Sequence, residues 1–377
     1  MKNRLTTYYG TAVWKLDTPF ENWLSKKADN SRFFRSLYVL YYKIFDREYY
    51  NKGLEMINKA IKDFRINNTE VAPRLSDKEL RQDMIYTLHR FGADFQEYFV
   101  FEFYGLNTFG REEFLTNKKR YEYYHLLNDD ENFFLFEDKK KTYEIFGKYY
   151  GRDVLPIDGP ADKAAFLEFA AKHATFMYKP VGGAEGRGIQ KITVNDRAEA
   201  ETFFDGIIDK GRFLAEEVII QDPRMAALNP NSVNTVRVPA IICKGEVKIF
   251  HPFFRIGVGD AVVDNNGFGG IAASVDAETG IIYTRGLTKK GHWYLKHPDT
   301  GAQIVGFQLP EWDALIKLTK ELTPSVKGTR YIAWDFALTE KGWIVVEANA
   351  LGGVCPLQGQ DKIGRKYELL DLIAMGK

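Results

Sequence analysis

Three oxygen-bearing side chains, Asp335, Glu347 and Asn349, lie on either side of a turn at Thr339–Gly342. The flanking segments are apolar and of strand length, which predicts a two-stranded hairpin. With the hairpin centred on residue 341, Asp335 lies opposite Glu347 on one face. Asn349 is two residues further along and points the same way. Two carboxylates and a carboxamide on one face are hard oxygen ligands suited to Mg²⁺ or Mn²⁺.

A solvated polar face on an edge hairpin is the alternative. The residues around Glu347 form a nearly continuous apolar run from Ile344 to Ala348, which is typical of a buried strand. Acids placed in such a strand need a partner. The sequence therefore favours a metal site.

A second motif is a lysine followed by glycines. The segment FMYKPVGGAEGRGIQKI (176–192) predicts a strand that ends at Lys179, a loop and a return strand. The loop glycines are Gly182, Gly183, Gly186 and Gly188. Glycines let backbone N–H groups approach phosphate oxygens, and the lysine adds a point charge. The loop lacks the Gly-Lys-Ser/Thr of a Walker A motif, and a tight turn would use glycines equally.

Charged residues also interrupt three later apolar runs. Glu216 and Glu217 interrupt the run 213–220, where the pattern alone favours a salt-bridged surface strand. Arg237 and Arg255 lie in predicted strands, where an arginine is seldom buried without an anionic partner.

Short β-rich runs and helix-like runs alternate from about residue 133, which predicts an α+β fold with hairpins. The predicted strands are 174–178, 189–194, 213–220, 233–243, 247–254, 330–338 and 343–348, and the predicted helices are 139–150, 161–172, 197–210 and 310–322.

The segment 1–130 is predicted to be mostly helical, because only five of the 32 glycines lie at positions 1–140. Apolar stripes at helical spacing run through 33–45, 54–64 and 80–91. The aromatic stripe Phe33, Phe34, Leu37, Tyr38, Tyr41, Ile44 and Phe45 would suit a membrane surface or a core. No cluster of basic residues flanks it in the sequence, so packing against the rest of the protein is favoured.

Composition excludes several classes of protein. The 377 residues suggest two to three domains at ~150 residues each. With 52 basic and 51 acidic residues, the net charge of +1 argues against a nucleic-acid partner. Cys243 and Cys355 cannot form a disulfide framework. The sequence shows no signal-peptide core and no apolar run of ~20 residues that would span a membrane. We therefore expect a cytoplasmic protein.

The order of these motifs resembles the ATP-grasp superfamily over roughly residues 130–365. The segments Asn234–Arg237, Val263–Asn265 and Pro310–Trp312 look most like its sugar-transfer-associated group, related to α-L-glutamate ligases. The resemblance implies two α+β subdomains that grip ATP. We expect a helical region at 1–130, a small subdomain at 131–215 with Lys179 and the glycine loop, and a large subdomain at 216–377 with the metal site.

The resemblance also implies residue roles. Lys139, at the start of a helix after Asp138, and Lys179 would hold phosphates, although Lys140 or Lys141 could replace Lys139. Glu216 would lie near the adenine amino group, with the backbone of Glu217 and Ile219 on the adenine edge. Asp335, Glu347 and Asn349 would hold Mg²⁺, with Glu347 bridging two ions. Arg237 would face the transferred phosphate, and Arg255 resembles such a residue less closely. The weaker substrate candidates are Asn265, Gly269, Gly270, His292 and His297.

The implied activity is a carboxylate–amine ligase that forms an acyl phosphate from ATP and then an amide, releasing ADP and Pi. A uronic-acid-type sugar or glycan and an amino acid or other amine, in polysaccharide biosynthesis, are the expected substrates. The alternatives are a kinase or other phosphotransferase on a sugar and a non-catalytic nucleotide-binding scaffold. The sequence does not indicate an oligomeric state.

Overall fold

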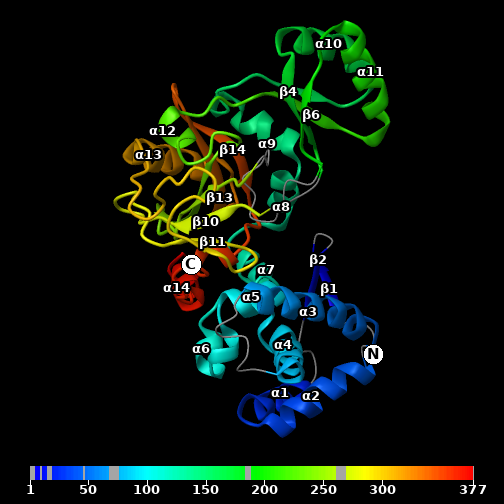
Figure 1. The fold of residues 1–377 in the computed structure, drawn as a ribbon, viewed down its shortest axis with the longest axis vertical. Coiled ribbons are helices and arrows are strands. Elements are labelled where there is room, and N and C mark those ends of the chain that lie inside the picture. Colours follow the sequence, from blue (N-terminus) through cyan, green and yellow to red (C-terminus); the bar gives the residue numbers. More distant parts are fainter. Residues whose placement is uncertain are drawn as a thin grey trace. The chain divides into compact units, whose positions relative to one another are not determined.

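The computed structural model describes residues 5–8, 11–14, 19–45, 47–67, 76–182, 188–259 and 269–376. The chain forms two compact units (Figure 1). A helical unit comprises Met1–Leu126, Leu287–Trp293 and Gly353–Lys377, and an α+β unit comprises Leu127–Gly286 and Tyr294–Gly352. The predicted division assigned 353–377 to the large subdomain, whereas here that segment joins the helices.

The helical unit confirms that the segment 1–130 is mostly helical. Its elements are β1 (Leu5–Tyr8), β2 (Thr11–Trp14), α1 (Pro19–Asn30), α2 (Arg32–Phe45), α3 (Arg47–Asn67), α4 (Asp77–Phe91), α5 (Phe95–Val100), α6 (Thr108–Glu112), α7 (Arg120–Tyr124) and α14 (Lys366–Met375). The β1–β2 hairpin was missed, although its Thr, Tyr, Val and Trp residues favour strands.

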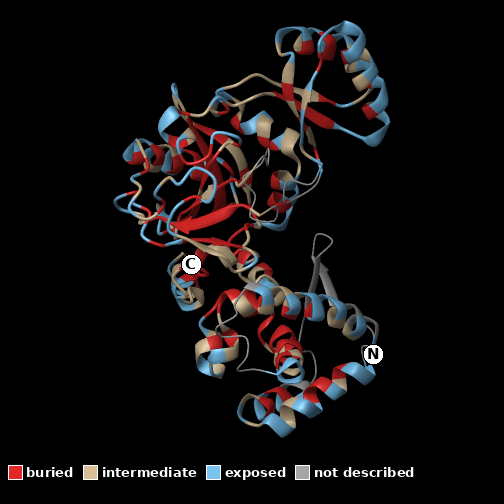
Figure 2. Ribbon diagram, viewed as in Figure 1, coloured by how far each residue is buried: buried red, intermediate tan, exposed pale blue. Residues whose placement is uncertain are grey.

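The stripes of α3 and α4 pack in the core as predicted. The buried members are Ile57, Ile61 and Phe64 on α3, and Leu80, Met84, Leu88 and Phe91 on α4. The stripe of α2 differs, because Tyr38 is buried but Phe33, Leu37, Ile44 and Phe45 are exposed. The prediction that this stripe packs in the core was therefore wrong for most of its members (Figure 2).

The first part of the α+β unit is a four-stranded sheet with helices on one face. Its elements are α8 (Asp130–Glu137), α9 (Lys139–Phe146), β3 (Val154–Ile157), α10 (Lys163–Lys172), β4 (Thr175–Pro180), β5 (Gln190–Thr193), α11 (Arg197–Ile207) and β6 (Phe213–Glu217), in sheet order β3-β6-β4-β5. Phe176 and Tyr178 of β4 pack in a core with residues of α10 and α11. Because side chains alternate along a strand, Met177 and Lys179 point to the opposite face.

The second part is a larger antiparallel sheet. Its elements are α12 (Pro223–Ala226), β7 (Thr235–Cys243), β8 (Glu246–Ile249), β9 (Phe253–Ile256), β10 (Ile271–Ser274), α13 (Trp312–Leu322), β13 (Tyr331–Thr339) and β14 (Gly342–Asn349). The order is β10-β9-β7-β13-β14, and β8 also pairs with β7. The chain passes between the two units at β11 (Gly286–Thr288) and β12 (Trp293–Tyr294).

One predicted strand is interrupted in the structure and another ends early. The predicted strand 247–254 is two strands, β8 and β9, separated by His251 in the left-handed region (φ 48°) and by Pro252, which has no N–H to donate. The predicted strand 213–220 ends at Glu217.

The β13–β14 hairpin has the predicted pairing of Asp335 with Glu347, but for a different reason. Its tip is the pair Thr339–Gly342, so the hairpin centre is half a residue before 341. Val346 is an extra residue between the pairs Phe336–Val345 and Asp335–Glu347, which makes a β-bulge. Without that bulge the tip register would place Glu347 opposite Trp334, on the other face.

We predict that Gly280→Ala lowers the free energy of unfolding by about 3 kcal/mol, because Gly280 has φ +73° and a Cβ there would lie 2.4 Å from Trp312 Cγ on α13. Gly301 has nearly the same φ, +71°, but open space around it. Gly301→Ala should therefore cost only about 1 kcal/mol. Urea unfolding of both variants measures the difference, and equal losses would contradict the proposed clash.

Candidate active site

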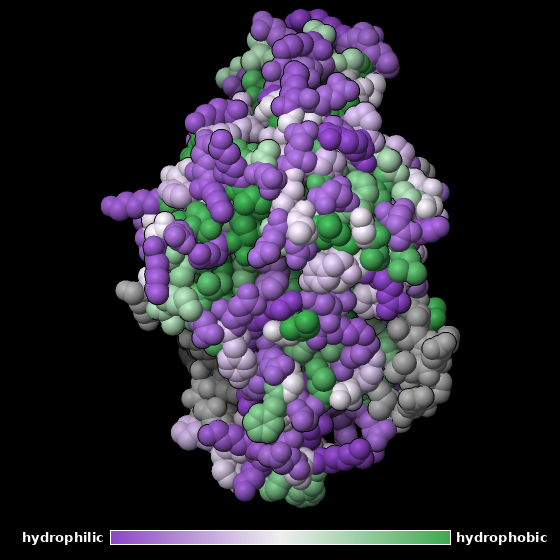
Figure 3. Space-filling model, turned by 90° about the vertical axis from the view of Figure 1, so that its left-hand side faces the viewer, coloured by the Kyte–Doolittle hydropathy of each residue, from purple (hydrophilic) through white to green (hydrophobic). Residues whose placement is uncertain are grey.

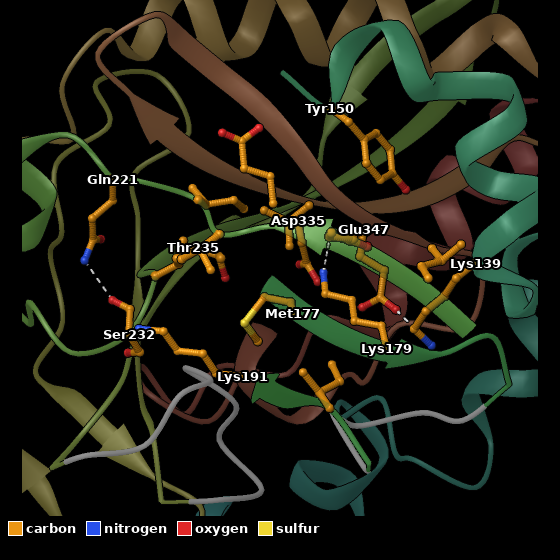
Figure 4. Close-up of a pocket in the computed structure, with 18 of the residues that line it drawn as sticks. Lys139, Tyr150, Met177, Lys179, Lys191, Gln221, Ser232, Thr235, Asp335 and Glu347 are labelled. Atoms are coloured by element: carbon orange, nitrogen blue, oxygen red, sulfur yellow. Dashed lines mark hydrogen bonds and ion pairs between the residues drawn. The ribbon is translucent and has the colours of Figure 1, made fainter. Parts of the chain in front are cut away.

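A pocket of about 450 Å³ lies in the α+β unit, a volume typical of small-molecule sites. The four-stranded sheet contributes Met177, Lys179, Leu214 and Glu216, and the larger sheet contributes Thr235, Arg255, Asp335 and Glu347. Lys139, Lys179, Asp335 and Glu347 lie close together, whereas Gln221 and Ser232 lie on the opposite side (Figure 4). The pocket thus brings together residues from segments that lie far apart in the sequence.

A row of charged side chains crosses three neighbouring strands. Glu347 on β14 pairs with Asp335 on β13, and Asp335 pairs with Arg237 on β7. Asp335 is 1 % exposed, whereas the Glu347 side chain is 38 % exposed. Glu347 is therefore the accessible carboxylate of the pair.

Two guanidinium groups hold the Asp335 carboxylate. Arg237 donates from Nε to Oδ1 (2.6 Å) and from Nη2 to Oδ2 (2.5 Å), while Arg255 Nη2 lies 3.0 Å from Oδ2. Arg255 also donates to Thr235 Oγ1. Burial raises the pKa of Asp335, but the two arginines outweigh burial, so its pKa lies below the ordinary value. Both strand arginines therefore have the anionic partner that their burial requires.

A second buried charge cluster lies on the four-stranded sheet. Glu216 Oε2 accepts from Lys179 Nζ (2.8 Å) and from Arg152 Nε (2.9 Å) and Nη2 (2.6 Å). Burial raises the pKa of Glu216, but Arg152 and Lys179 lower it to about 2. Burial lowers the pKa of Lys179, an effect that Glu216 opposes. Glu216 is thus held by two cations, and its contact with adenine stays a prediction.

Arg152 was missed by sequence analysis and connects the two sheets. Besides Glu216 on β6, it donates from Nη1 to the carbonyl oxygen of Val345 (2.8 Å), next to the bulge in β14. Its side chain is only 2 % exposed. The Gly-Arg-Asp turn that contains it gives no local sign of burial, so only the folded structure reveals this role.

Lys139 lines the pocket and lies 3.8 Å from Glu347 Oε1. It is the first residue of α9, where the Asp138 carboxylate accepts from the backbone N–H of Lys140 and Lys141 as an N-cap. The Lys140 side chain instead pairs with Asp158. The structure therefore favours Lys139 over Lys140 as the pocket lysine.

The segment after β6 offers free backbone groups to the pocket. Val218, Ile219 and Ile220 line the pocket, and their backbones make no hydrogen bond within the described part of the chain. The backbone N–H of Glu217 is already donated to Asp153 (2.9 Å). Of the two residues predicted to bind an adenine edge through the backbone, Ile219 has the freer amide.

The predicted metal ligands fit a divalent ion in donor type. Asp335 and Glu347 border the pocket, and Asn349 lies on the same strand face. The Asn349 Nδ2 atom is buried and finds no partner among the described residues. This N–H donor needs a hydrogen-bond acceptor, whereas a divalent ion would bind the amide oxygen Oδ1, so the fit to a metal rests on the three oxygen donors alone.

Other predicted residues lie elsewhere. Gly182 and Gly188 flank the glycine loop, whereas Gly183, Gly186 and Asn265 lie outside the described residues. Gly269, Gly270 and His297 do not border the pocket. His297 is buried and its Nε2–H donates to Gly257 O (2.7 Å), so its contact with substrate stays a prediction. His292 belongs to the helical unit.

A second group of metal-ligand types, Asp153, His173 and Glu217, lies near the end of β6. His173 Nε2 lies 2.8 Å from Asp153 Oδ2, and Lys172 also pairs with Asp153. The lysine and histidine lower the pKa of Asp153. These contacts explain the group as an ion-pair network.

The Glu216 cluster makes a prediction about pH. Because the pKa of Glu216 is about 2 in the folded protein and 4.5 ordinarily, its stabilising effect is complete above pH 4.5 and is lost as the pH falls towards 2. Glu216→Gln should lower the free energy of unfolding by about 3 kcal/mol at pH 7, since two buried cations lose their partner. The difference in free energy of unfolding between wild type and variant should narrow by about 1.4 kcal/mol per pH unit below 4.5.

Urea unfolding between pH 3 and 7 measures this gap. Glu168→Gln, at an exposed position on α10, is the control and should show a small, pH-independent effect. A gap for Glu216→Gln that stays constant with pH would contradict the lowered pKa.

Comparison with known proteins agrees with the motif order. Residues 118–366, about two thirds of the chain, match the family described as sugar-transfer associated ATP-grasp. A search of curated proteins gives no match. Similar solved structures include the ATP-grasp ligase PsnB complexed with a minimal precursor (13 % identity, TM-score 0.41, 66 % of this chain and 64 % of that chain).

D-alanyl-alanine synthetase A from Vibrio cholerae O1 biovar eltor str. N16961 is also similar (12 % identity, TM-score 0.41, 64 % of this chain and 65 % of that chain). The D-alanine–D-alanine ligase from Helicobacter pylori is a third (16 % identity, TM-score 0.41, 64 % of this chain and 61 % of that chain). The chain thus spans less than two thirds of the length of these structures. On the strength of the family match, the chain belongs to the sugar-transfer associated ATP-grasp family and has its α+β ATP-grasp fold.

Proposed function

We propose that the protein is an ATP-dependent carboxylate–amine ligase that acts through an acyl phosphate. The observation that carries this proposal is a single pocket bordered both by the unpaired backbone of Val218–Ile220 and by the cations Lys139, Lys179 and Arg255. A purine needs backbone donors and acceptors at its edge, and a triphosphate needs positive charge.

The segment after β6, Val218–Ile220, is suited to bind the adenine base. Free N–H and C=O groups that border a pocket must be satisfied by water or by a ligand. The neighbouring side chains Met177, Leu214 and Val346 are apolar and offer flat contact to a planar ring. We therefore assign the adenine to this part of the pocket, with Ile219 as its backbone contact.

The cations are suited to the phosphates. Lys139 and Lys179 come from different elements, α9 and β4, and both line the pocket. Phosphoryl transfer depends on neutralising negative charge and on positioning, with little covalent work for the protein. Glu216 holds the Lys179 ammonium in place and is itself held by Arg152, so that the lysine needs little reorganisation when phosphate arrives.

The proposed reaction has two steps. A carboxylate oxygen of the acceptor attacks the γ-phosphorus of ATP, the bond to the β,γ-bridging oxygen breaks, and ADP leaves. An amine nitrogen then attacks the acyl carbon, the bond to the phosphate oxygen breaks, and Pi and one proton leave as the amide forms. We assign Arg237 and Arg255 to stabilising the transferred group: Arg255 borders the pocket, whereas Arg237 does not border it and donates to Asp335. As guanidinium groups both stay charged throughout.

Asp335, Glu347 and Asn349 would hold Mg²⁺ or Mn²⁺, which supplies charge neutralisation at the β- and γ-phosphates when bound. Asp335 is kept ionised by Arg237 and Arg255, and Glu347 presents its carboxylate to the pocket. The protein itself holds these three oxygen donors on one face of the β13–β14 hairpin.

The family description supports a substrate linked to sugar transfer. We propose that the carboxylate belongs to a sugar acid or glycan, and that the amine is an amino acid or similar amine, within polysaccharide biosynthesis. Within the part of the chain that the structure describes, no helix is long and apolar enough to cross a membrane.

We predict that Glu347→Gln lowers kcat for ADP release by about 100-fold or more, because it removes the accessible carboxylate of the metal face. Glu340→Gln is the matched control, since Glu340 is exposed at the tip of the same hairpin. A coupled assay measures ADP while amino acids and uronic acids are screened with Mg²⁺, and mass spectrometry identifies the product. Full activity in Glu347→Gln would remove Glu347 from the site.

The same screen separates the alternatives. A ligase gives a product with the mass of carboxylate plus amine minus water, and with hydroxylamine in place of the amine it gives a hydroxamate. A sugar kinase gives a stable phosphoester without any amine. A nucleotide-binding scaffold binds ATP but releases no ADP with any pair, and that outcome would overturn the ligase proposal.

A further prediction concerns the metal without nucleotide. Three cations (Lys139, Arg237 and Arg255) lie around two carboxylates (Asp335 and Glu347), so the cluster carries a net positive charge. Mg²⁺ alone should therefore bind no tighter than ~1 mM, since it normally relies on substrate phosphates as ligands. Calorimetry should show saturable ATP binding in Mg²⁺ buffer, whereas micromolar binding of Mg²⁺ alone would contradict the charge argument.

A further inference from the structure

Helices α1 and α2 carry a set of exposed apolar side chains. On α2, Phe33, Leu37, Leu40 and Ile44 recur at spacings of four, three and four, which places them on one side of the helix. Phe33 is 66 % exposed and Ile44 is 62 % exposed. Phe20 and Trp23 on α1 and Phe45 on α2 are also exposed. We call these seven residues the α1–α2 apolar face.

Ring contacts join the two helices into one continuous face. Phe33 contacts Phe34, and Phe34 contacts Trp23 of α1 (centroids 5.5 and 5.9 Å apart). Phe20 contacts both Trp23 and Tyr41, and Tyr41 contacts Phe45 (5.9, 5.6 and 4.8 Å). The exposed rings are therefore connected through half-buried ones.

The opposite side of α2 is firmly packed. Tyr38 and Tyr42 are buried and contact Tyr86 and His89 of α4. Arg35 on α2 donates to Asp83 of α4 (2.8 Å). Because these contacts fix which side of α2 faces the core, the apolar side is held outward.

Exposed basic side chains lie on the same two helices as the apolar face. Lys26 and Lys27 on α1 and Arg32 and Lys43 on α2 are exposed, and Arg32 also lies 3.8 Å from Glu79. Asp29 is the one acidic side chain described on these two helices, and it is held by Arg90 and Tyr86. At the lower end of Figure 3, apolar side chains (green) lie next to polar ones (purple) on the surface.

We propose that the α1–α2 apolar face docks on the surface of an anionic phospholipid membrane. Aromatic and aliphatic side chains rimmed by lysine and arginine are the pattern of helices that lie in the interfacial plane. Each basic side chain near such a surface adds attraction to the lipid headgroups. A second copy of the chain fits less well, because the basic rims of two copies would repel each other.

Co-sedimentation of the full chain with vesicles tests the proposal. The chain should pellet with vesicles made of two parts phosphatidylcholine to one part phosphatidylglycerol, and at least tenfold more weakly with phosphatidylcholine alone. The fraction of protein that pellets with anionic vesicles should fall in 0.5 M NaCl, since salt screens exposed charges. The assay contains no nucleotide or substrate, so its outcome is independent of the proposed ligase activity.

Two paired variants locate the surface. Phe33→Ser with Ile44→Ser, and separately Lys26→Glu with Lys27→Glu, should each weaken vesicle binding by about tenfold or more. The controls are Phe109→Ser, at an 83 % exposed aromatic on α6, and Lys317→Glu with Lys320→Glu on α13, which should bind as the wild type does. Circular dichroism checks that each variant is folded.

Three outcomes would overturn the proposal. One is the absence of vesicle binding by the wild type. Another is equal binding to neutral and anionic vesicles. The third is a dimer in light scattering that Phe33→Ser with Ile44→Ser dissociates while vesicle binding is absent, which would assign the face to a second copy of the chain.

Discussion

The structure of the pocket depends on one buried carboxylate, that of Asp335. An ionised group at the centre of a sheet is tolerated only when it is paired, and Asp335 is paired twice, with Arg237 and Arg255. These arginines lie on β7 and β9, so the pairing requires that both strands and β13 keep one register. The bulge at Val346 then adds Glu347 to the same face. The two ion pairs of one carboxylate thus connect three strands, and the bulge brings the fourth strand's Glu347 to the same face.

The second cluster follows the same rule on the other sheet. Glu216 pairs with both Arg152 and Lys179, and Arg152 reaches across to the carbonyl of Val345. Glu216, which holds Lys179, is thus connected through Arg152 to the strand segment next to the bulge that places Glu347. Leaving a hydrogen bond of a buried guanidinium unmade costs free energy. Lys179 and the strand that carries Glu347 are therefore connected through Glu216 and Arg152.

Sequence reasoning succeeded where the interaction is local and failed where it is not. A hairpin centred on residue 341 placed Asp335 opposite Glu347, although a shifted hairpin centre and an unforeseen bulge compensated for each other. The helix start at Lys139 after the Asp138 cap was equally local. Arg152 and Glu216 are far apart in the sequence, and no periodicity relates them. Likewise, apolar composition alone does not reveal that β6 ends at Glu217.

The stripe of α2 illustrates the same limit for a surface. Periodicity identifies which residues share one side of a helix, but the side that faces the core is chosen by partners on other helices, here Asp83, Tyr86 and His89 of α4. Arg32 and Lys43 lie on α2 itself but form no cluster in the sequence, and Lys26 and Lys27 belong to the preceding helix. An amphipathic surface built from two helices is therefore a property of tertiary structure, and its polar rim has to be identified in space.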